Sequence, residues 1–209
     1  MTEDHRHVRR EYASDALRRS DLRNEPLAQF TNWLSRALED GLTDATAMSL
    51  ATAGSDGAPS VRIVLLKAHD KDGLTFYSDY GSQKGQNLTE NPKAELLFHW
   101  REHNRQVRIA GVVERTSRRD AEAYFESRPL ASQLSAAASE QSQPITDRQA
   151  LEDKVTQLQY GEPTCPENWG GYRLRPEKFE FWQGRENRLH DRFVYSRRDS
   201  GWQLERLQP

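Results

Sequence analysis

The sequence predicts a mainly β protein with flanking helices, built as an antiparallel meander or barrel. Short stretches rich in small and β-branched residues follow one another at 46–53, 60–67 and 74–78, and turns separate them. Two further stretches follow at 94–100 and 105–114. Parallel strands need long, usually helical crossover connections, so this spacing favours an antiparallel sheet. The expected fold class is therefore α+β.

Two helices are expected among these strands. The first starts at Pro26, because proline suits a first helical turn, and Gly41 supplies its stop. The second opens at 81–85 and must end before Pro92. Free backbone N–H groups and the helix dipole at such a start favour an anion.

A third helix is expected to begin after Ser117 as its N-cap. Tyr124, Arg128 and Ser132 then fall at i, i+4 and i+8, so one helical face would present a phenol, a guanidinium and a hydroxyl. That set suits a phosphate group. An ordinary polar helix face is the alternative, and Pro129 could break the spacing.

The stretch from Phe179 to Phe193 combines large aromatic and cationic side chains. As strand, turn and strand, it would place Arg188, His190 and Arg192 on one face, roughly 6.5 to 7 Å apart. Such a row suits an anion. A solvated edge strand, whose charges deter pairing with another sheet, is the alternative.

Composition limits the classes of partner. The 30 basic and 32 acidic residues nearly cancel, so anion binding has to come from local clusters, and neither nucleic acid nor membrane is expected as a partner. Cys165 is the only cysteine, which excludes an internal disulfide and fits a reducing cytoplasm. No apolar signal region and no run near the roughly 18 apolar residues of a membrane span occur. We expect a cytoplasmic protein.

Residues 1–20 differ from the rest of the chain. They are charged, lack apolar periodicity and contain five arginines, which predicts a flexible arm. Either a solubilising tail or a lid over a site fits this composition. Residues 21–209 are short enough for a single domain.

Common catalytic and metal motifs are absent. The sequence has no P-loop, GxGxxG, HExxH or GxSxG pattern, and His99 and His103 flank an expected turn, so no metal site is expected. Cations at strand and helix ends, interleaved with Tyr and Trp, indicate a planar, phosphorylated ligand. Arg62 and Lys67, five apart, face opposite sides of a regular strand, so they serve one site only through a bulge, or else two adjacent ligands.

Several blocks of the sequence resemble one family. RIVLLK at 62–67, FYSDYGSQKG at 76–85, YFESRPLASQ at 124–133 and FWQGRENRLHDR at 181–192 resemble the pyridoxine/pyridoxamine 5′-phosphate oxidases. RREY, RQVR, EQSQ and WGGY extend the likeness over nearly the whole chain. Enzymes of that family are homodimers with an antiparallel split β-barrel, which would make residues 21–209 one FMN-binding domain, with FMN at the subunit interface.

The resemblance implies a reaction and a set of site residues. The reaction is oxidation of pyridoxamine or pyridoxine 5′-phosphate to pyridoxal 5′-phosphate, with hydride transfer to FMN and reoxidation by O2 to give H2O2. The residues implied to bind FMN are Arg62, Ile63, Val64, Leu65, Leu66, Lys67, Tyr77, Ser78, Gln83, Lys84, Gln106, Gln141, Ser142, Trp182 and Arg192. Those implied to bind the substrate are Arg9, Arg10, Glu11, Tyr12, Lys67, Tyr124, Arg128, Ser132, Arg188, Leu189 and His190.

Arg188 and His190 are the catalytic residues that the resemblance implies. Arg188 would fix the substrate carbon C4′ against the flavin N5, and His190 would lie beside it. Asp44 is a weaker candidate for accepting a proton, and a plain turn residue is the alternative.

One position departs from the family pattern. Where the family usually has Ser-Arg-Lys, this chain has Ser82, Gln83 and Lys84, so an amide replaces a guanidinium near the FMN phosphate. A charged hydrogen bond contributes roughly 1.5 to 3 kcal/mol, so weaker retention of FMN is expected.

Two other functions remain alternatives. One is a related split-barrel flavin protein with another substrate, which would not be expected to combine RLHDR with the Tyr124, Arg128 and Ser132 set. The other is a non-catalytic protein that stores or delivers pyridoxal 5′-phosphate. The arginine-rich arm could also dock on a partner or on nucleic acid, but the near-zero net charge argues against nucleic acid.

Overall fold

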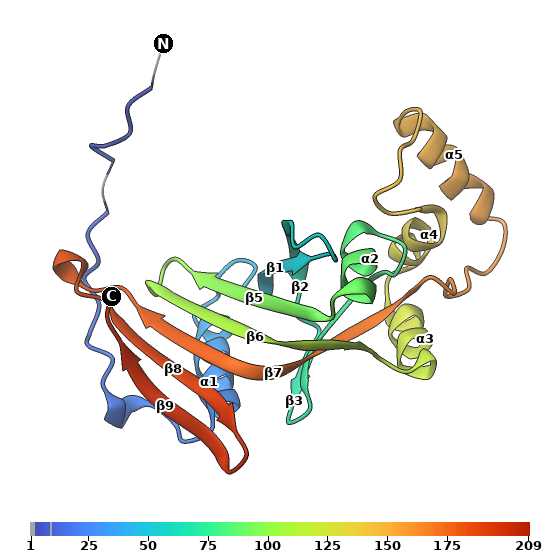
Figure 1. The fold of residues 1–209 in the computed structure, drawn as a ribbon. Coiled ribbons are helices and arrows are strands. Elements are labelled where there is room, and N and C mark those ends of the chain that lie inside the picture. Colours follow the sequence, from blue (N-terminus) through green and yellow to red (C-terminus); the bar gives the residue numbers. More distant parts are fainter. Residues whose placement is uncertain (1–2, 9) are drawn as a thin grey trace. The chain divides into compact units, whose positions relative to one another are not determined.

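The computed structural model describes residues 3–8 and 10–209. Within these residues one nine-stranded sheet has the order β2-β1-β5-β6-β7-β4-β3, and β8 pairs with β7 and β9 (Figure 1). The strands are Ala47–Ala53 (β1), Pro59–Leu65 (β2), Ala68–Asp70 (β3), Gly73–Asp79 (β4), Lys93–Trp100 (β5), Arg105–Arg115 (β6), Trp169–Gln183 (β7), Asp191–Arg198 (β8) and Gly201–Leu207 (β9).

Five α-helices accompany the strands in the described part of the chain. They are Pro26–Glu39 (α1), Gln83–Glu90 (α2), Arg118–Ser127 (α3), Leu130–Ala138 (α4) and Arg148–Leu158 (α5), with short 3-10 turns at Arg19–Asp21 (η1) and Glu186–Arg188 (η2). The pairs β1–β2, β3–β4, β4–β7, β7–β8 and β8–β9 are antiparallel. The predicted fold class, mainly antiparallel β with flanking helices, is confirmed.

The chain divides into two compact units. The first comprises the described residues of Met1–Thr46 together with Leu96–Ile109 and Glu177–Pro209. The second comprises Ala47–Glu95 and Ala110–Pro176. Strands β5, β6 and β7 therefore contribute residues to both units.

The core of the first unit is aromatic. The ring of Phe30 on α1 lies 4.9 Å from that of Phe98, and the ring of Trp33 lies 5.3 Å from that of Phe181. Helix α1 ends at Glu39, and Gly41 supplies its stop as predicted, with a φ of 67° that suits glycine. The N–H of Leu42 then donates to the carbonyl of Ala37, so the helix end is capped by its own backbone.

The hairpin of β1 and β2 opens the second unit. Strand β1 buries alternate side chains, whereas the outward face of β2 exposes Val61, Ile63 and Leu65 by 69, 65 and 42%. Strand β2 ends at Leu65, so Arg62 and Lys67 do not share a regular strand, and the alternation that would place them on opposite sides does not apply.

Two local predictions were wrong. Strand β7 ends at Gln183 and β8 begins only at Asp191, so Arg188 and His190 lie outside a strand and form no row with Arg192. The reason is the backbone of Asn187 and Arg188, whose φ angles of 53° and 63° are incompatible with a strand.

The second wrong prediction is the single helical face that would present Tyr124, Arg128 and Ser132, whereas the alternative, that Pro129 breaks the spacing, is confirmed. Helix α3 ends at Ser127, Arg128 has an extended backbone, and α4 begins at Leu130. Pro129 causes the break, because its ring disfavours a helical conformation of the residue before it. In Figure 1, α4 and α5 then lie side by side.

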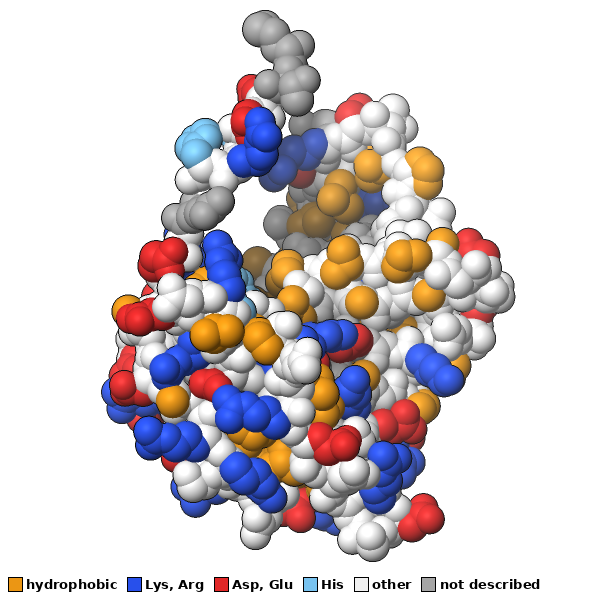
Figure 2. Space-filling model, turned by 60° about the vertical axis from the view of Figure 1, so that its left-hand side comes forward, with side chains coloured by type: hydrophobic (Ala, Val, Ile, Leu, Met, Phe, Trp, Pro, Cys, Tyr) orange, Lys and Arg blue, Asp and Glu red, His pale blue; other side chains and the backbone are white. Residues whose placement is uncertain are grey.

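No helix within the described residues is long and apolar enough to cross a membrane. On the face drawn in Figure 2, basic and acidic side chains are interspersed, in keeping with the net charge of −2. Anion binding on the molecule therefore depends on local clusters.

Phe30→Ala should lower the free energy of unfolding by about 3 to 5 kcal/mol, because it leaves a cavity among fully buried rings. Leu38→Ala is the matched control on the same helix, since Leu38 is 54% exposed, and should change stability by about 0.5 kcal/mol or less. Urea unfolding of both variants measures the difference. Equal destabilisation by the two would contradict the packing described for α1.

Candidate active site

A cavity of about 960 Å³ lies in the second unit. Its walls come from β2 and the residues after it, the end of β4, the start of α2 and the segments around α3, α4 and α5. The sequence-predicted residues that line it are Arg62, Ile63, Val64, Leu65, Lys67, Tyr77, Ser78, Gln83, Lys84, Tyr124, Arg128, Ser132, Gln141 and Ser142. Leu66 is buried and does not line it.

Positive charge dominates this cavity. Among the described lining residues, the cations are Arg62, Lys67, Lys84 and Arg128, and the only carboxylate is Asp79. Asp79 is already occupied, because its oxygens accept the N–H of Gly81 at 2.6 Å and the amide of Asn168 at 2.9 Å. An anionic ligand would balance the remaining charge.

Lys84 is the most deeply buried of these cations, with 8% of its surface exposed. Its amino group donates to Ser78 Oγ at 3.0 Å, to Ser82 Oγ at 3.2 Å and to Gln141 Oε1, all neutral acceptors. Burial, and then the charge of Arg62, lower the pKa of Lys84 to about 8, and Asp79 opposes the shift. A bound anion would favour the charged form of this amine.

Arg62 is held by the protein itself. Its terminal nitrogens donate to Leu50 O, Thr52 Oγ1, Ser60 O and Ser60 Oγ at 2.7 to 3.1 Å. Burial lowers the pKa of Arg62. Arg62 thus presents a fixed positive charge to the cavity, while both of its terminal nitrogens already donate hydrogen bonds to the protein.

The start of α2 packs closely against the backbone of Tyr80. Ser82 caps the helix by accepting the N–H of Gly85, and a Cβ at Gly85 would lie 2.1 Å from the carbonyl oxygen of Tyr80. The N–H of Gln83 donates to Ser142 Oγ at 3.3 Å, and its side chain is exposed. This cluster of a helix start, a buried amine and hydroxyls fits a phosphate group.

A second cationic seat lies on an aromatic row. Tyr77 stacks on Tyr124 with centroids 3.9 Å apart and on Trp169 at 5.6 Å, and the guanidinium of Arg128 lies 4.9 Å from the centre of the Trp169 ring. Arg128 Nη1 is buried with no hydrogen-bond partner among the described residues. A buried donor without an acceptor is costly, so this nitrogen marks a place for an anionic oxygen.

In the first unit, Tyr12, Trp182 and His190 form a cluster. The Tyr12 ring meets the edges of Trp182 at 5.6 Å and of His190 at 5.4 Å, and Trp182 and His190 lie 4.7 Å apart. Gly184 leaves the room for this, since a Cβ there would lie 2.6 Å from Tyr12 Cδ1. The structure therefore brings three of the predicted residues together.

His190 has a defined tautomer in this cluster. Its Nδ1 accepts the backbone N–H of Arg185 at 3.0 Å, so the proton of the neutral ring resides on Nε2. Burial lowers the pKa of His190, and the positive charge of Arg188 lowers it further. His190 is thus a neutral hydrogen-bond donor near pH 7.

The remaining predicted residues belong neither to the cavity lining nor to the ring contacts of Tyr12. Arg192 pairs with Trp182 across the β7–β8 ladder. Arg192 donates to both oxygens of the buried Glu180 at 3.1 and 3.2 Å and to Gln208 O at 3.0 Å. Gln106 is half-buried on β6, and Leu189 is 70% exposed.

The predicted residues of the arm and Asp44 complete the set. Arg9 lies outside the described residues. The guanidinium of Arg10 donates to Arg101 O at 3.1 Å, and Glu11 is exposed. Asp44 is an exposed residue with a φ of 54°, as in the turn that was its alternative interpretation.

Sequence reasoning missed three residues with clear contacts. Trp169 supports the aromatic row, Glu180 holds Arg192, and Asp191 is a buried carboxylate. WGGY was noticed as a block, so it could have indicated Trp169, whereas no local signal marks the two acids. Within residues 3–8 and 10–209, no group of three or more His, Cys, Asp or Glu side chains is placed to hold a metal ion.

The fold and the cavity define an antiparallel β protein with a cationic pocket suited to a phosphorylated ligand. Known structures share the fold. PhzG from Burkholderia lata 383, solved with tetrahydrophenazine-1-carboxylic acid, superposes with a TM-score of 0.89 at 32% identity, covering 94% of this chain and 99% of that one. A pyridoxamine 5′-phosphate oxidase-related, FMN binding protein of Nostoc punctiforme PCC 73102 gives 0.70 at 23% identity, covering 86% and 97%. The fold is the split barrel of these proteins.

Comparison of the sequence with known families defines the family more narrowly than comparison of the fold does. Residues 34–161 match the family model described as pyridoxamine 5′-phosphate oxidase, and residues 169–209 match the pyridoxine 5′-phosphate oxidase C-terminal dimerisation region. The pyridoxine/pyridoxamine 5′-phosphate oxidase of Deinococcus deserti is 52% identical over 208 residues, or 97% of each chain. The chain belongs to the pyridoxamine 5′-phosphate oxidase family, and the resemblance seen in its sequence blocks is confirmed.

The pKa of Lys84 predicts how anion binding depends on pH. Lys84 attracts an anion only when protonated, so affinity should fall as pH rises through about 8, by up to tenfold per unit. Methyl phosphate is a suitable probe, because it is a dianion above about pH 7. Calorimetric titration of flavin-free protein measures the affinity.

Lys84→Arg is the control for this titration, since its guanidinium stays charged and its affinity should not vary over the same range. A wild-type affinity that stays constant across pH 8, as in Lys84→Arg, would contradict the role given to Lys84.

Proposed function

We propose that the protein oxidises pyridoxamine 5′-phosphate and pyridoxine 5′-phosphate to pyridoxal 5′-phosphate, with FMN as cofactor and O2 as electron acceptor. The observation that carries this proposal is that one cavity combines four cations with one hydrogen-bonded carboxylate. Two phosphorylated ligands, cofactor and substrate, would balance its charge. Relatives that are about half identical over nearly their full length and named as this oxidase support the same reaction.

The seat around Lys84 suits the phosphate of FMN. Lys84, the start of α2 and the hydroxyl groups of Ser78 and Ser142 would hold it, while Arg62 adds a fixed charge. When bound, FMN would supply a hydride acceptor at N5 for the hydrogen on substrate C4′ and would pass two electrons to O2, which leaves as H2O2.

The seat around Arg128 suits the phosphate of the substrate. The unpartnered Nη1 of Arg128, the hydroxyl of Ser132 and the phenol of Tyr124 are donors at one side of the cavity, and Lys67 adds charge. Held by its phosphate, the pyridine ring would be confined before any reaction. Such confinement lowers the entropic cost of reaching the reactive geometry.

Arg188 and His190 would act on the pyridine end of the substrate. As a neutral donor through Nε2, His190 can donate a hydrogen bond to an oxygen substituent on the pyridine ring. Its Nε2 cannot accept a proton, because it already carries one. Arg188, exposed beside it, would orient C4′. The alcohol would then give pyridoxal 5′-phosphate and H2O2, whereas the amine would also release ammonia after hydrolysis.

We also propose a homodimer with FMN at the subunit interface. The match to a C-terminal dimerisation region supports a dimer, and so does the apolar outer face of β2, where Val61, Ile63 and Leu65 are exposed. A cytoplasmic location remains a prediction from the sequence.

The direct test is turnover. Purified protein reconstituted with FMN should convert pyridoxine 5′-phosphate to pyridoxal 5′-phosphate with one H2O2 per product, and pyridoxamine 5′-phosphate with ammonia besides. Absorbance of the product and a coupled peroxide assay measure both. Protein that binds pyridoxal 5′-phosphate yet carries no flavin and makes no peroxide would instead favour a storage or delivery protein.

Arg128→Met should raise the KM for pyridoxine 5′-phosphate by about ten- to hundredfold, because a charged hydrogen bond to phosphate is lost. Arg119→Met is the matched control on α3, since Arg119 is exposed and does not line the cavity. Steady-state kinetics of both variants decide. An unchanged KM in Arg128→Met would remove Arg128 from the substrate site.

Gln83→Arg should bind FMN about ten- to hundredfold more tightly than the wild type, because it restores a guanidinium at the start of α2. Quenching of flavin fluorescence gives the two dissociation constants. A wild-type constant as low as that of Gln83→Arg would show that Gln83 costs no affinity.

A further inference from the structure

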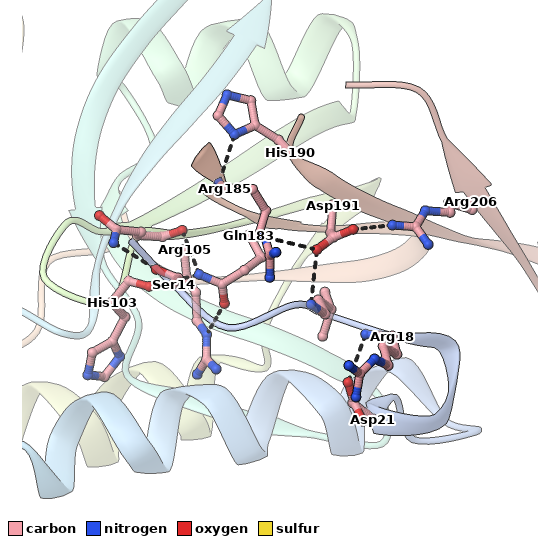
Figure 3. Close-up of polar contacts among 12 residues, drawn as sticks. Ser14, Arg18, Asp21, His103, Arg105, Gln183, Arg185, His190, Asp191 and Arg206 are labelled. Carbon is pink, nitrogen blue, oxygen red and sulfur yellow. Dashed lines mark hydrogen bonds and ion pairs between the residues drawn. The ribbon is translucent and has the colours of Figure 1, made fainter. Parts of the chain in front are cut away.

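Asp191, the first residue of β8, is a buried carboxylate outside the cavity described above, with 5% of its surface exposed. Its Oδ2 accepts the backbone N–H of Leu17 at 3.0 Å, and its Oδ1 pairs with the guanidinium of Arg206 on β9. Arg185 Nε lies 4.0 Å from Oδ2. Figure 3 shows the side chains of Arg185 and Arg206 directed at Asp191.

The contacts of Asp191 are strong because the carboxylate is buried. A buried charge is tolerated only when it is paired and hydrogen-bonded, and removing one partner leaves the others unsatisfied. Arg206 is fixed in turn, because it faces Phe193 across the β8–β9 ladder and its guanidinium lies 5.1 Å from that ring. Asp191 is therefore a rigid anchor for the N–H of Leu17.

The anchored segment leads directly to the aromatic cluster. Leu17 is buried, Ser14 accepts the side-chain amide of Asn104 at 2.8 Å, and Tyr12 lies against Gly184, Trp182 and His190. Ser14 and Asn104 are both part-exposed. Among the described contacts of residues 13–17, the bond from Leu17 to Asp191 is the buried one.

Asp191 is tied to His190 as well. The two are adjacent in sequence, and Arg185 contacts both of them. Its backbone N–H donates to His190 Nδ1, and its side chain faces Asp191. One carboxylate thus fixes both sides of the contact between Tyr12 and His190: the segment that carries the phenol and the turn that carries the imidazole.

We propose that Asp191 is a positioning residue that holds Tyr12 against His190 and so keeps these two side chains in the arrangement that binds the substrate. This inference rests on the proposed function for the identity of the substrate. Asp191 touches no substrate, and its effect is transmitted through Tyr12 and His190.

The test is Asp191→Asn in the full-length, FMN-loaded protein, with pyridoxine 5′-phosphate as substrate. The KM should rise about tenfold or more, as expected for loss of a charged, buried contact, whereas kcat should change by less than about threefold. Hydrogen exchange of the segment that contains the Leu17 amide should speed up in the same variant. Asp199→Asn, an exposed aspartate in the β8–β9 turn, is the control and should change neither quantity.

A double-mutant cycle with Tyr12→Ala separates positioning from general destabilisation. If Asp191 acts through Tyr12, the KM effects of the two substitutions are not additive, and the double variant should resemble Tyr12→Ala alone. Additive effects, or a kcat loss as large as the KM gain, would overturn the proposal.

Two further outcomes are decisive. Should Asp191→Asn fail to fold, Tyr12→Ala still has to raise KM with faster exchange limited to the N-terminal segment, and an unchanged KM would overturn the proposal. Wild-type protein without turnover would refute the proposed function, but exchange that is unaltered in Asp191→Asn would refute the anchor whether or not turnover is seen.

Discussion

The excess of positive charge in the cavity of the second unit is the constraint on which the rest of that unit depends. Lys84 is surrounded by neutral oxygens, Arg62 is tied to backbone and hydroxyl acceptors, and Arg128 keeps a buried nitrogen without a partner. Desolvating a cation costs several kcal/mol unless attraction to an opposite charge offsets this penalty. A protein that keeps such groups together gains most when an anion arrives, and phosphate offers both the charge and enough acceptor oxygens to satisfy them.

Two glycines of β7 shape the backbone near the cavity. A Cβ at Gly170 would lie 2.1 Å from the hydroxyl oxygen of Tyr80, and one at Gly171 would lie 2.4 Å from Thr116 Oγ1. These two glycines let β7 approach its neighbours closely, and Trp169 beside them joins the aromatic row under Arg128. The uncharged residues of WGGY thus help to position the charged side chain of Arg128.

Signals confined to a few residues predicted the elements well. Pro26 and Gly41 bound α1, Ser117 caps α3, and the first hairpin forms where turn residues interrupt β-branched stretches. These succeed because a cap or a turn depends on its immediate neighbours. Most of the cavity lining could be predicted only through the family resemblance, since the residues come from separate elements.

The errors have physical causes of two kinds. The strand expected at Arg188 and His190 fails because Asn187 and Arg188 adopt positive φ, which alternation of side chains does not reveal. The partnerships of Glu180 with Arg192 and of Asp191 with Leu17 and Arg206 join residues that are 12, 174 and 15 positions apart. Only the folded chain specifies which hydrogen-bond donor or cation each of these carboxylates contacts.

The measurement that tests the central claim most directly compares FMN with riboflavin, which has the same ring system and no phosphate. If the unbalanced cations of the cavity are what hold the cofactor, FMN should bind at least about a hundredfold more tightly than riboflavin, as two charged hydrogen bonds would require. Raising the salt concentration should weaken FMN binding and leave riboflavin binding nearly unchanged. Equal affinities for the two flavins would contradict the account.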